Sequence, residues 1–75
     1  MNYRKEEVYY LENKFLCKMA CRILTSRNDT KRKELAIDFW YVAYKLIPEL
    51  GHVNCTLTAT NVKHGLLSNF RIIVT

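Results

Sequence analysis

The sequence predicts one small α+β domain, in which two amphipathic helices are followed by a C-terminal β-hairpin, in the order ααββ. Apolar residues recur every three or four positions over residues 6–24 and again over residues 31–50, which is the spacing of a helix face. After Gly51 the period changes to two, the pattern of a half-buried strand. A chain of 75 residues with two Gly and one Pro is one ordered domain, near the smallest size that folds on a single core.

The first helix is predicted over residues 6–24. Five apolar residues mark its face: Val8, Leu11, Phe15, Met19 and Ile23. Five more widen that face beyond half of the circumference: Tyr10, Leu16, Cys17, Ala20 and Leu24. A helix this broadly apolar is either central to the core or buried against a second chain.

The second helix is predicted over residues 31–50, after a stretch that holds several helix-capping side chains. Its main face is apolar and consists of Leu35, Phe39, Val42, Leu46 and Leu50. Pro48 lacks a backbone donor and disfavours a helical Ile47, so the last turn is expected to kink or stop there. Gly51 is suited to end whatever remains of the helix.

The hairpin is predicted from two alternating segments on either side of a turn at residues 61–65. The first segment alternates at Val53, Cys55, Leu57 and Ala59, and the second places Leu66, Ser68, Phe70, Ile72 and Val74 on one face. An alternative interpretation makes residues 61–67 a short third helix, which Gly65 disfavours.

The end of the chain also predicts self-association. The last strand is expected to lie at the outer edge of the hairpin and to end in the apolar run Ile72-Ile73-Val74. Such an edge invites pairing with another copy, and a hairpin of two strands is marginal by itself. Together with the broad apolar helix faces, this edge predicts that a homodimer completes the fold.

The positive charge is concentrated in the first half of the chain. Residues 1–33 carry nine Lys or Arg against four acids, whereas residues 34–75 carry three of each. Seven of these cations are candidate ligands for an anion or a nucleic acid: Lys14, Lys18 and Arg22 along the first helix, and Arg27, Lys31, Arg32 and Lys33 around the start of the second. The alternatives are a solvated face that keeps the domain soluble and exposed cations screened by salt.

The sequence holds no phosphate loop, nucleotide fingerprint or nucleophile elbow, so neither catalysis nor a cofactor is expected. A zinc site would have to come from Cys17, Cys21, His52 and Cys55, whose spacing lacks the compact C-x₂-C pairs of recognisable zinc sites. Reduced, buried thiols are the favoured interpretation of the three cysteines.

Aromatic residues give the best indication of a protein partner. Trp40, Tyr41 and Tyr44 project around most of the second helix, so at least one is expected to be exposed or to lie at a subunit contact. Trp and Tyr are common anchors of protein interfaces. The candidate interface residues are Tyr10, Trp40, Tyr41, Tyr44 and Ile73.

These features predict a non-enzymatic binding protein, a regulator, adaptor or inhibitor of a protein partner, that acts as a homodimer. The alternative is a nucleic-acid-binding regulator that uses the basic ridge of the first helix and the basic turn after it. No apolar run approaches the length of a membrane span and no signal-peptide pattern is present, so a cytoplasmic protein without membrane contact is expected.

Overall fold

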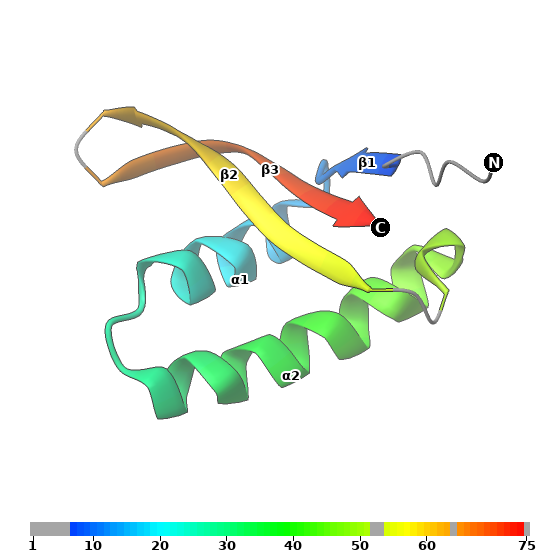
Figure 1. The fold of residues 1–75 in the computed structure, drawn as a ribbon, viewed down its shortest axis with the longest axis horizontal. Coiled ribbons are helices and arrows are strands. Elements are labelled where there is room, and N and C mark those ends of the chain that lie inside the picture. The colour runs from blue at the N-terminus through cyan, green and yellow to red at the C-terminus, as the bar shows by residue number, and fades with distance from the viewer. Residues whose placement is uncertain (1–6, 52–53, 64, 75) are drawn as a thin grey trace, which may run out of the picture.

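A computed structural model of the chain describes residues 7–51, 54–63 and 65–74 (Figure 1). Its elements follow the order β1 (Glu7–Tyr10), α1 (Lys14–Thr25), α2 (Asp29–Leu46), the 3₁₀ helix η1 (Pro48–Leu50), β2 (Cys55–Lys63) and β3 (Leu66–Val74). The predicted α+β class and the order of two helices before a hairpin are confirmed. A short N-terminal strand, which was not predicted, makes the sheet three-stranded.

The sheet is antiparallel with the strand order β1-β3-β2, so β3 is its central strand. Val8 of β1 lies opposite Ile73 on one side of β3, and Thr56 of β2 lies opposite Ile73 on the other side. The prediction that the run from Ile72 to Val74 forms an open outer edge is therefore wrong. Because β1 pairs along this run, the run is not open for pairing with another copy of the chain.

The predicted start of the first helix at residue 6 is also wrong, because residues 7–10 form β1 and α1 begins at Lys14. The Asn13 side chain fixes this start: its Oδ1 accepts hydrogen bonds from the backbone N–H groups of Phe15 and Leu16, at 2.9 and 3.1 Å. The core face of α1 then consists of Leu16, Ala20 and Ile23. Phe15, predicted on that face, is 60% exposed.

The second helix begins at Asp29, after Asn28, whose Oδ1 accepts a hydrogen bond from the Lys31 backbone N–H at 3.1 Å. The α-helix ends at Leu46 and not at residue 50. Pro48 explains this end, because Ile47 before it leaves helical geometry and Pro48 opens η1. The expected stop at Pro48 is confirmed. Leu46, predicted in the core, lies in the last turn and is exposed.

The hairpin contradicts the alternative of a third helix over residues 61–67, because β2 continues to Lys63 and β3 starts at Leu66. The predicted positions Val53 and His64 lie outside the described residues. The strands do not keep one register: Thr58 pairs with Arg71 but Thr60 pairs with Ser68. Asn69, with φ of +52°, supplies the bulge, and the bulge breaks the even alternation predicted from Leu66 to Val74.

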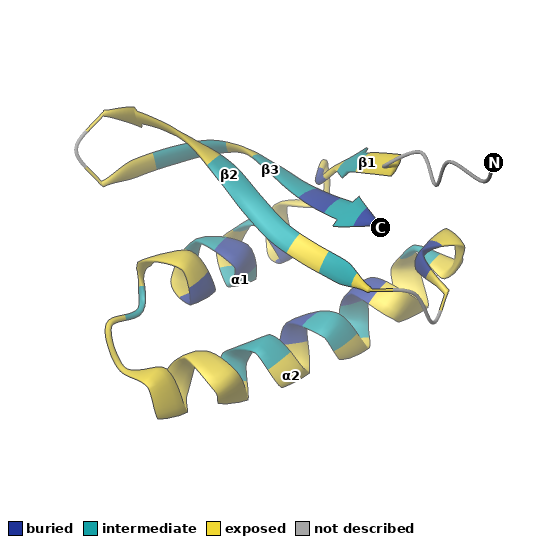
Figure 2. Cartoon of the chain, in the orientation of Figure 1, coloured by how far each residue is buried: buried dark blue, intermediate teal, exposed yellow. Residues whose placement is uncertain are grey.

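The two helices form an antiparallel pair that covers one face of the sheet, and no other element within the described residues covers the opposite face (Figure 1). The core lies between the two layers (Figure 2). It consists of Leu11, Leu16, Ala20, Ile23, Phe39, Ala43, Leu50, Ile72 and Val74. Each layer thus has an outward side that the core does not use.

Candidate interaction surfaces

Three large side chains of α2 are exposed: Ile37 and Tyr41 on its outward side, at 70% and 62%, and Tyr44 at its edge toward β2, at 39%. We call these residues the α2 outer face. Their spacing places them on one side of the helix, away from the fully buried Phe39 and Ala43. The expectation that at least one aromatic residue of this helix is exposed is thus confirmed.

Trp40 is different from its two aromatic neighbours because it is half-buried and belongs to the packing of the domain. Its ring meets Phe39 edge-on, with 5.0 Å between the ring centroids, and lies 5.8 Å from the ring of Tyr44. Trp40 therefore packs between buried Phe39 and Tyr44 of the α2 outer face, and it exposes little of its own surface.

Two contacts hold the tyrosines of the α2 outer face in place. The Nζ atom of Lys45 lies 4.3 Å from the centroid of the Tyr41 ring, a cation–π contact. Burial raises the pKa of Tyr44, and a hydrogen bond to the Cys55 side chain raises this pKa further. Tyr44 thus stays neutral and is tied toward β2, while Tyr41 points into solvent.

The uncovered side of the sheet forms a second surface, the outer sheet face: Val8, Tyr10, Thr56, Thr58, Arg71 and Ile73. Val8 and Tyr10 are 44% and 65% exposed, and Tyr10 lies opposite Arg71. Arg71 is held across the bulge, because its Nη1 donates to Thr60 Oγ1 at 2.8 Å and to the Asn69 carbonyl at 3.2 Å.

The structure therefore divides the predicted interface residues into two groups. Tyr10 and Ile73 share the outer sheet face, while Trp40, Tyr41 and Tyr44 belong to the helical layer on the other side of the core. Ile37 was missed by sequence reasoning, although its spacing of four from Tyr41 is a signal that identifies it.

All seven predicted basic ligands are exposed. Lys14, Lys18 and Arg22 follow α1, Arg27 lies in the turn, and Lys31, Arg32 and Lys33 belong to the first turns of α2. Arg32 forms an ion pair with Asp29.

The ends of the two basic groups meet in a cleft of about 310 Å³, which we call the helix-turn cleft. Its lining residues are Arg22, Thr25, Ser26, Lys31 and Leu35. Sequence reasoning gave the two cations but not the other three residues. They follow from the helix pairing, which places the last turn of α1 beside the first turns of α2.

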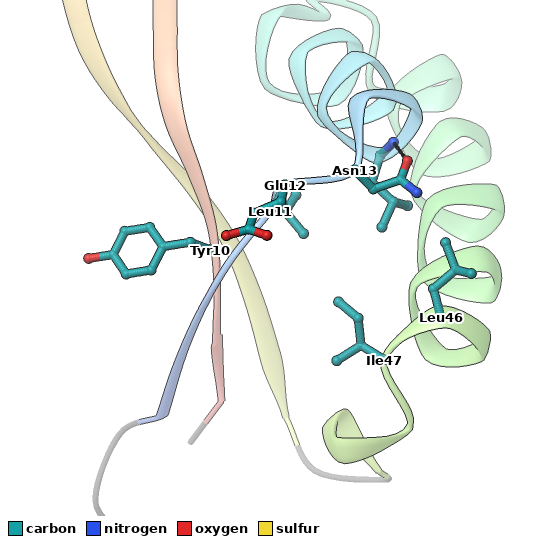
Figure 3. A pocket seen from close by; sticks show the side chains of 7 residues that line it. Tyr10, Leu11, Glu12, Asn13, Leu46 and Ile47 are labelled. Carbon is teal, nitrogen blue, oxygen red and sulfur yellow. Dashed lines mark hydrogen bonds between the residues drawn. The ribbon is translucent and has the colours of Figure 1, made fainter.

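A second cavity, of about 330 Å³, lies at the opposite end of the helix pair (Figure 3). It is lined by Tyr10, Leu11, Glu12, Asn13, Leu16, Leu46 and Ile47. In this view Tyr10 points away from the helices, and the Asn13 oxygen is used to cap α1 (Figure 3). The aliphatic lining carries one carboxylate, from Glu12, and offers no pair of groups for acid–base or nucleophilic catalysis.

The cysteines do not gather into a metal site within the described part of the chain, where no group of three or more His, Cys, Asp or Glu residues is placed to hold an ion. His52, the fourth residue of the possible zinc set, lies outside that part. The Cys17 Sγ donates to the Leu11 carbonyl at 3.4 Å, and burial raises the pKa of this thiol. Cys21 and Cys55 are half-buried, and neither forms a disulfide within the described residues.

Within the described residues, no helix combines the length and the apolar character needed to cross a membrane. Comparison of the chain with protein-family models, curated proteins and solved structures gave no match.

Proposed function

We propose that the protein is a non-enzymatic, protein-binding regulator that acts as a homodimer through the α2 outer face. One observation carries this proposal: Ile37 and Tyr41 are 70% and 62% exposed on a helix whose opposite side builds the core. Burying a large apolar side chain is worth about 1.5–3 kcal/mol. A contact that covers both residues on each copy therefore has a substantial driving force.

The Lys45 contact favours Tyr41 as the anchor of this surface. A lysine ammonium 4.3 Å from the ring centroid restricts the orientation of the tyrosine before any partner arrives. Ordering a free side chain at an interface costs about 0.5–1.5 kcal/mol, so a side chain that is already oriented binds at lower cost.

The charges along α2 favour a second copy of the chain as the partner. Glu34 and Lys45 are exposed on α2 and lie on the same side of the helix as Tyr41. An antiparallel pair of α2 helices places Glu34 of one copy beside Lys45 of the other, and a parallel pair would place like charges together.

Antiparallel pairing also gives the two-fold symmetry of most homodimers. Glu34 and Lys45 lie at nearly equal distances along α2 from the midpoint between Ile37 and Tyr41. A symmetry axis at that midpoint therefore brings Glu34 of each copy near Lys45 of the other.

Light scattering coupled to size-exclusion chromatography tests the proposal with the wild type and Tyr41→Glu. We expect a dimer for the wild type and a monomer for the variant, because the variant places two carboxylates at the centre of the contact. Val62→Glu is the matched control, because Val62 is 63% exposed and lies at the far end of the hairpin. A dimer that survives Tyr41→Glu, or a wild type that is monomeric at every concentration, would refute the proposal.

A second candidate function is that of a nucleic-acid-binding regulator. Its support is the exposure of all seven cations, of which Arg32 alone pairs with an acid within the described ranges. Binding that neutralises several phosphates weakens steeply as salt is added. Absence of binding to labelled DNA and RNA at low salt would exclude this candidate, and joint substitution of Lys31, Arg32 and Lys33 should abolish such binding without unfolding the protein.

A further inference from the structure

We infer that the helix-turn cleft is a binding site for a phosphate group. The cleft uses none of the residues of the α2 outer face, so this inference goes beyond the proposed dimer. It also gives the second candidate function, nucleic-acid binding, a specific contact, namely a phosphate bound in the helix-turn cleft. The phosphate can belong to a nucleic-acid strand or to a small phosphate ester, which share the chemistry that the cleft recognises.

Two cations from different helices line the same cleft. Arg22 comes from the last turn of α1 and Lys31 from the first turn of α2. No acidic side chain lines the cleft. The nearest acid in sequence, Asp29, is engaged by Arg32, and among the residues that the structure describes neither Arg22 nor Lys31 has an ionic partner.

Helix electrostatics favour only one of these two cations where it lies. Arg22 in the last turn of α1 complements the helix dipole, whereas Lys31 in the first turn of α2 opposes it, and the two cations repel each other. An anion in the cleft offsets the cost at Lys31 and the repulsion. This arrangement therefore favours a ligand of negative charge.

The remaining walls determine how such an anion is held. Leu35, half-buried, forms an apolar side that strengthens the electrostatic attraction inside the cleft. The hydroxyls are already used as donors, because Thr25 Oγ1 donates to the Cys21 carbonyl at 2.7 Å and Ser26 Oγ to the Asn28 carbonyl at 3.3 Å. Binding thus depends on Arg22, whose planar group suits phosphate, and on Lys31.

The size of the cleft and its surroundings suit a phosphate carried by a larger molecule. Its volume of about 310 Å³ exceeds that of a single phosphate group and reaches the lower range of ligand sites. Arg27 in the turn and Arg32 and Lys33 in α2 adjoin the cleft residues in sequence and are exposed. These cations can contact neighbouring phosphates of a strand.

Amide chemical shifts in ¹H–¹⁵N spectra test the inference, in titrations with inorganic phosphate, a single-stranded DNA and a duplex DNA. We expect shifts in residues 22–35. Arg22→Gln and Lys31→Gln should each weaken binding about tenfold, the value of one charged hydrogen bond. For DNA, each variant should also reduce the slope of log affinity against log salt by about 1. Lys63→Gln removes the same charge from the hairpin, far from the cleft, and should leave binding unchanged.

Shifts in the cleft with DNA, lost in Arg22→Gln and Lys31→Gln but not in Lys63→Gln, would support a nucleic-acid strand as the source of the phosphate. The same pattern with inorganic phosphate but not with DNA would support a small phosphate ester. No shift in the cleft with any of the three ligands, or an equal loss in all three variants, would overturn the inference. DNA binding without shifts in the cleft would also overturn it, while leaving the second candidate function intact.

Discussion

Asn13 and Asn28 show how single side chains determine where the helices start. Each residue has extended backbone geometry and accepts backbone N–H groups of the helix that follows. Each places a polar side chain where the first turn would otherwise leave donors without partners. Asn13 has an additional role, because α1 can pack under the sheet only if the chain changes from strand to helix at this point.

Asn13→Ala should therefore lower the free energy of unfolding by about 1 kcal/mol, the usual value of an N-cap. Denaturation in urea, followed by circular dichroism, measures this change. Asn61→Ala, at an exposed position of β2, is the control and should stay within about 0.5 kcal/mol of the wild type. Equal effects of the two substitutions would show that Asn13 does not cap α1.

Cys17 carries a residue-scale prediction about pH. Burial raises the pKa of its thiol, so the folded state holds the proton more tightly than the unfolded state does. The stability that this preference contributes is present at neutral pH and is lost as the pH rises above the ordinary pKa of a thiol. Unfolding free energies measured across that range should fall less steeply in Cys17→Ala than in the wild type. Parallel curves for the two proteins would contradict this account.

Among the elements, α2 could be predicted from sequence nearly in full and β1 could not. The boundaries of α2 follow from local chemistry, the capping residues before it and Pro48 after it. Val8 and Leu11 lie three residues apart, which fits the helical period, so the local pattern of this segment favours a helix. The strand forms because Val8 pairs with Ile73, a contact between distant parts of the chain that no local pattern contains.

The candidate surfaces could be predicted to a similar extent. The exposure of aromatic residues on α2 could be predicted, because large side chains surround this helix and only one side of a helix can face the core. The pairing of Tyr10 with Arg71 on the outer sheet face depends on β1, and the helix-turn cleft depends on how the two helices pack. The sequence alone identifies residues of these surfaces, but it does not show which residues from other elements lie beside them in space.

Mutations can test which face of α1 packs against the core, because the sequence pattern and the structure place different residues there. Leu16 is 1% exposed and Phe15 is 60% exposed. Leu16→Ala should cost about 2–5 kcal/mol of unfolding free energy through the cavity it leaves, whereas Phe15→Ala should cost less than about 1 kcal/mol. Urea denaturation of both variants measures the difference, and the reverse ranking would show that α1 presents the other face to the core.

The whole molecule is a two-layer domain with apolar side chains on both outward sides. Around the turn between its helices lie five exposed cations, Arg22, Arg27, Lys31, Arg32 and Lys33. The outward side of the helices carries Ile37 and Tyr41, and that of the sheet carries Val8 and Tyr10. A chain this short gains stability when such surfaces are covered. Glu34 and Lys45 lie beside the α2 outer face in an arrangement that a second copy of the same chain complements, which is why the proposed dimer is placed there.

Sedimentation equilibrium of charge-reversal variants is the most direct test of that dimer. Glu34→Lys and Lys45→Glu should each weaken the dimer, because each places like charges together twice in a symmetric pair. The double variant should associate more tightly than either single variant, since an exposed ion pair of reversed sense has a value similar to that of the original, about 0.2–1 kcal/mol. A wild type that sediments as a monomer of 8.9 kDa, or a double variant weaker than both single variants, would contradict the antiparallel α2 dimer.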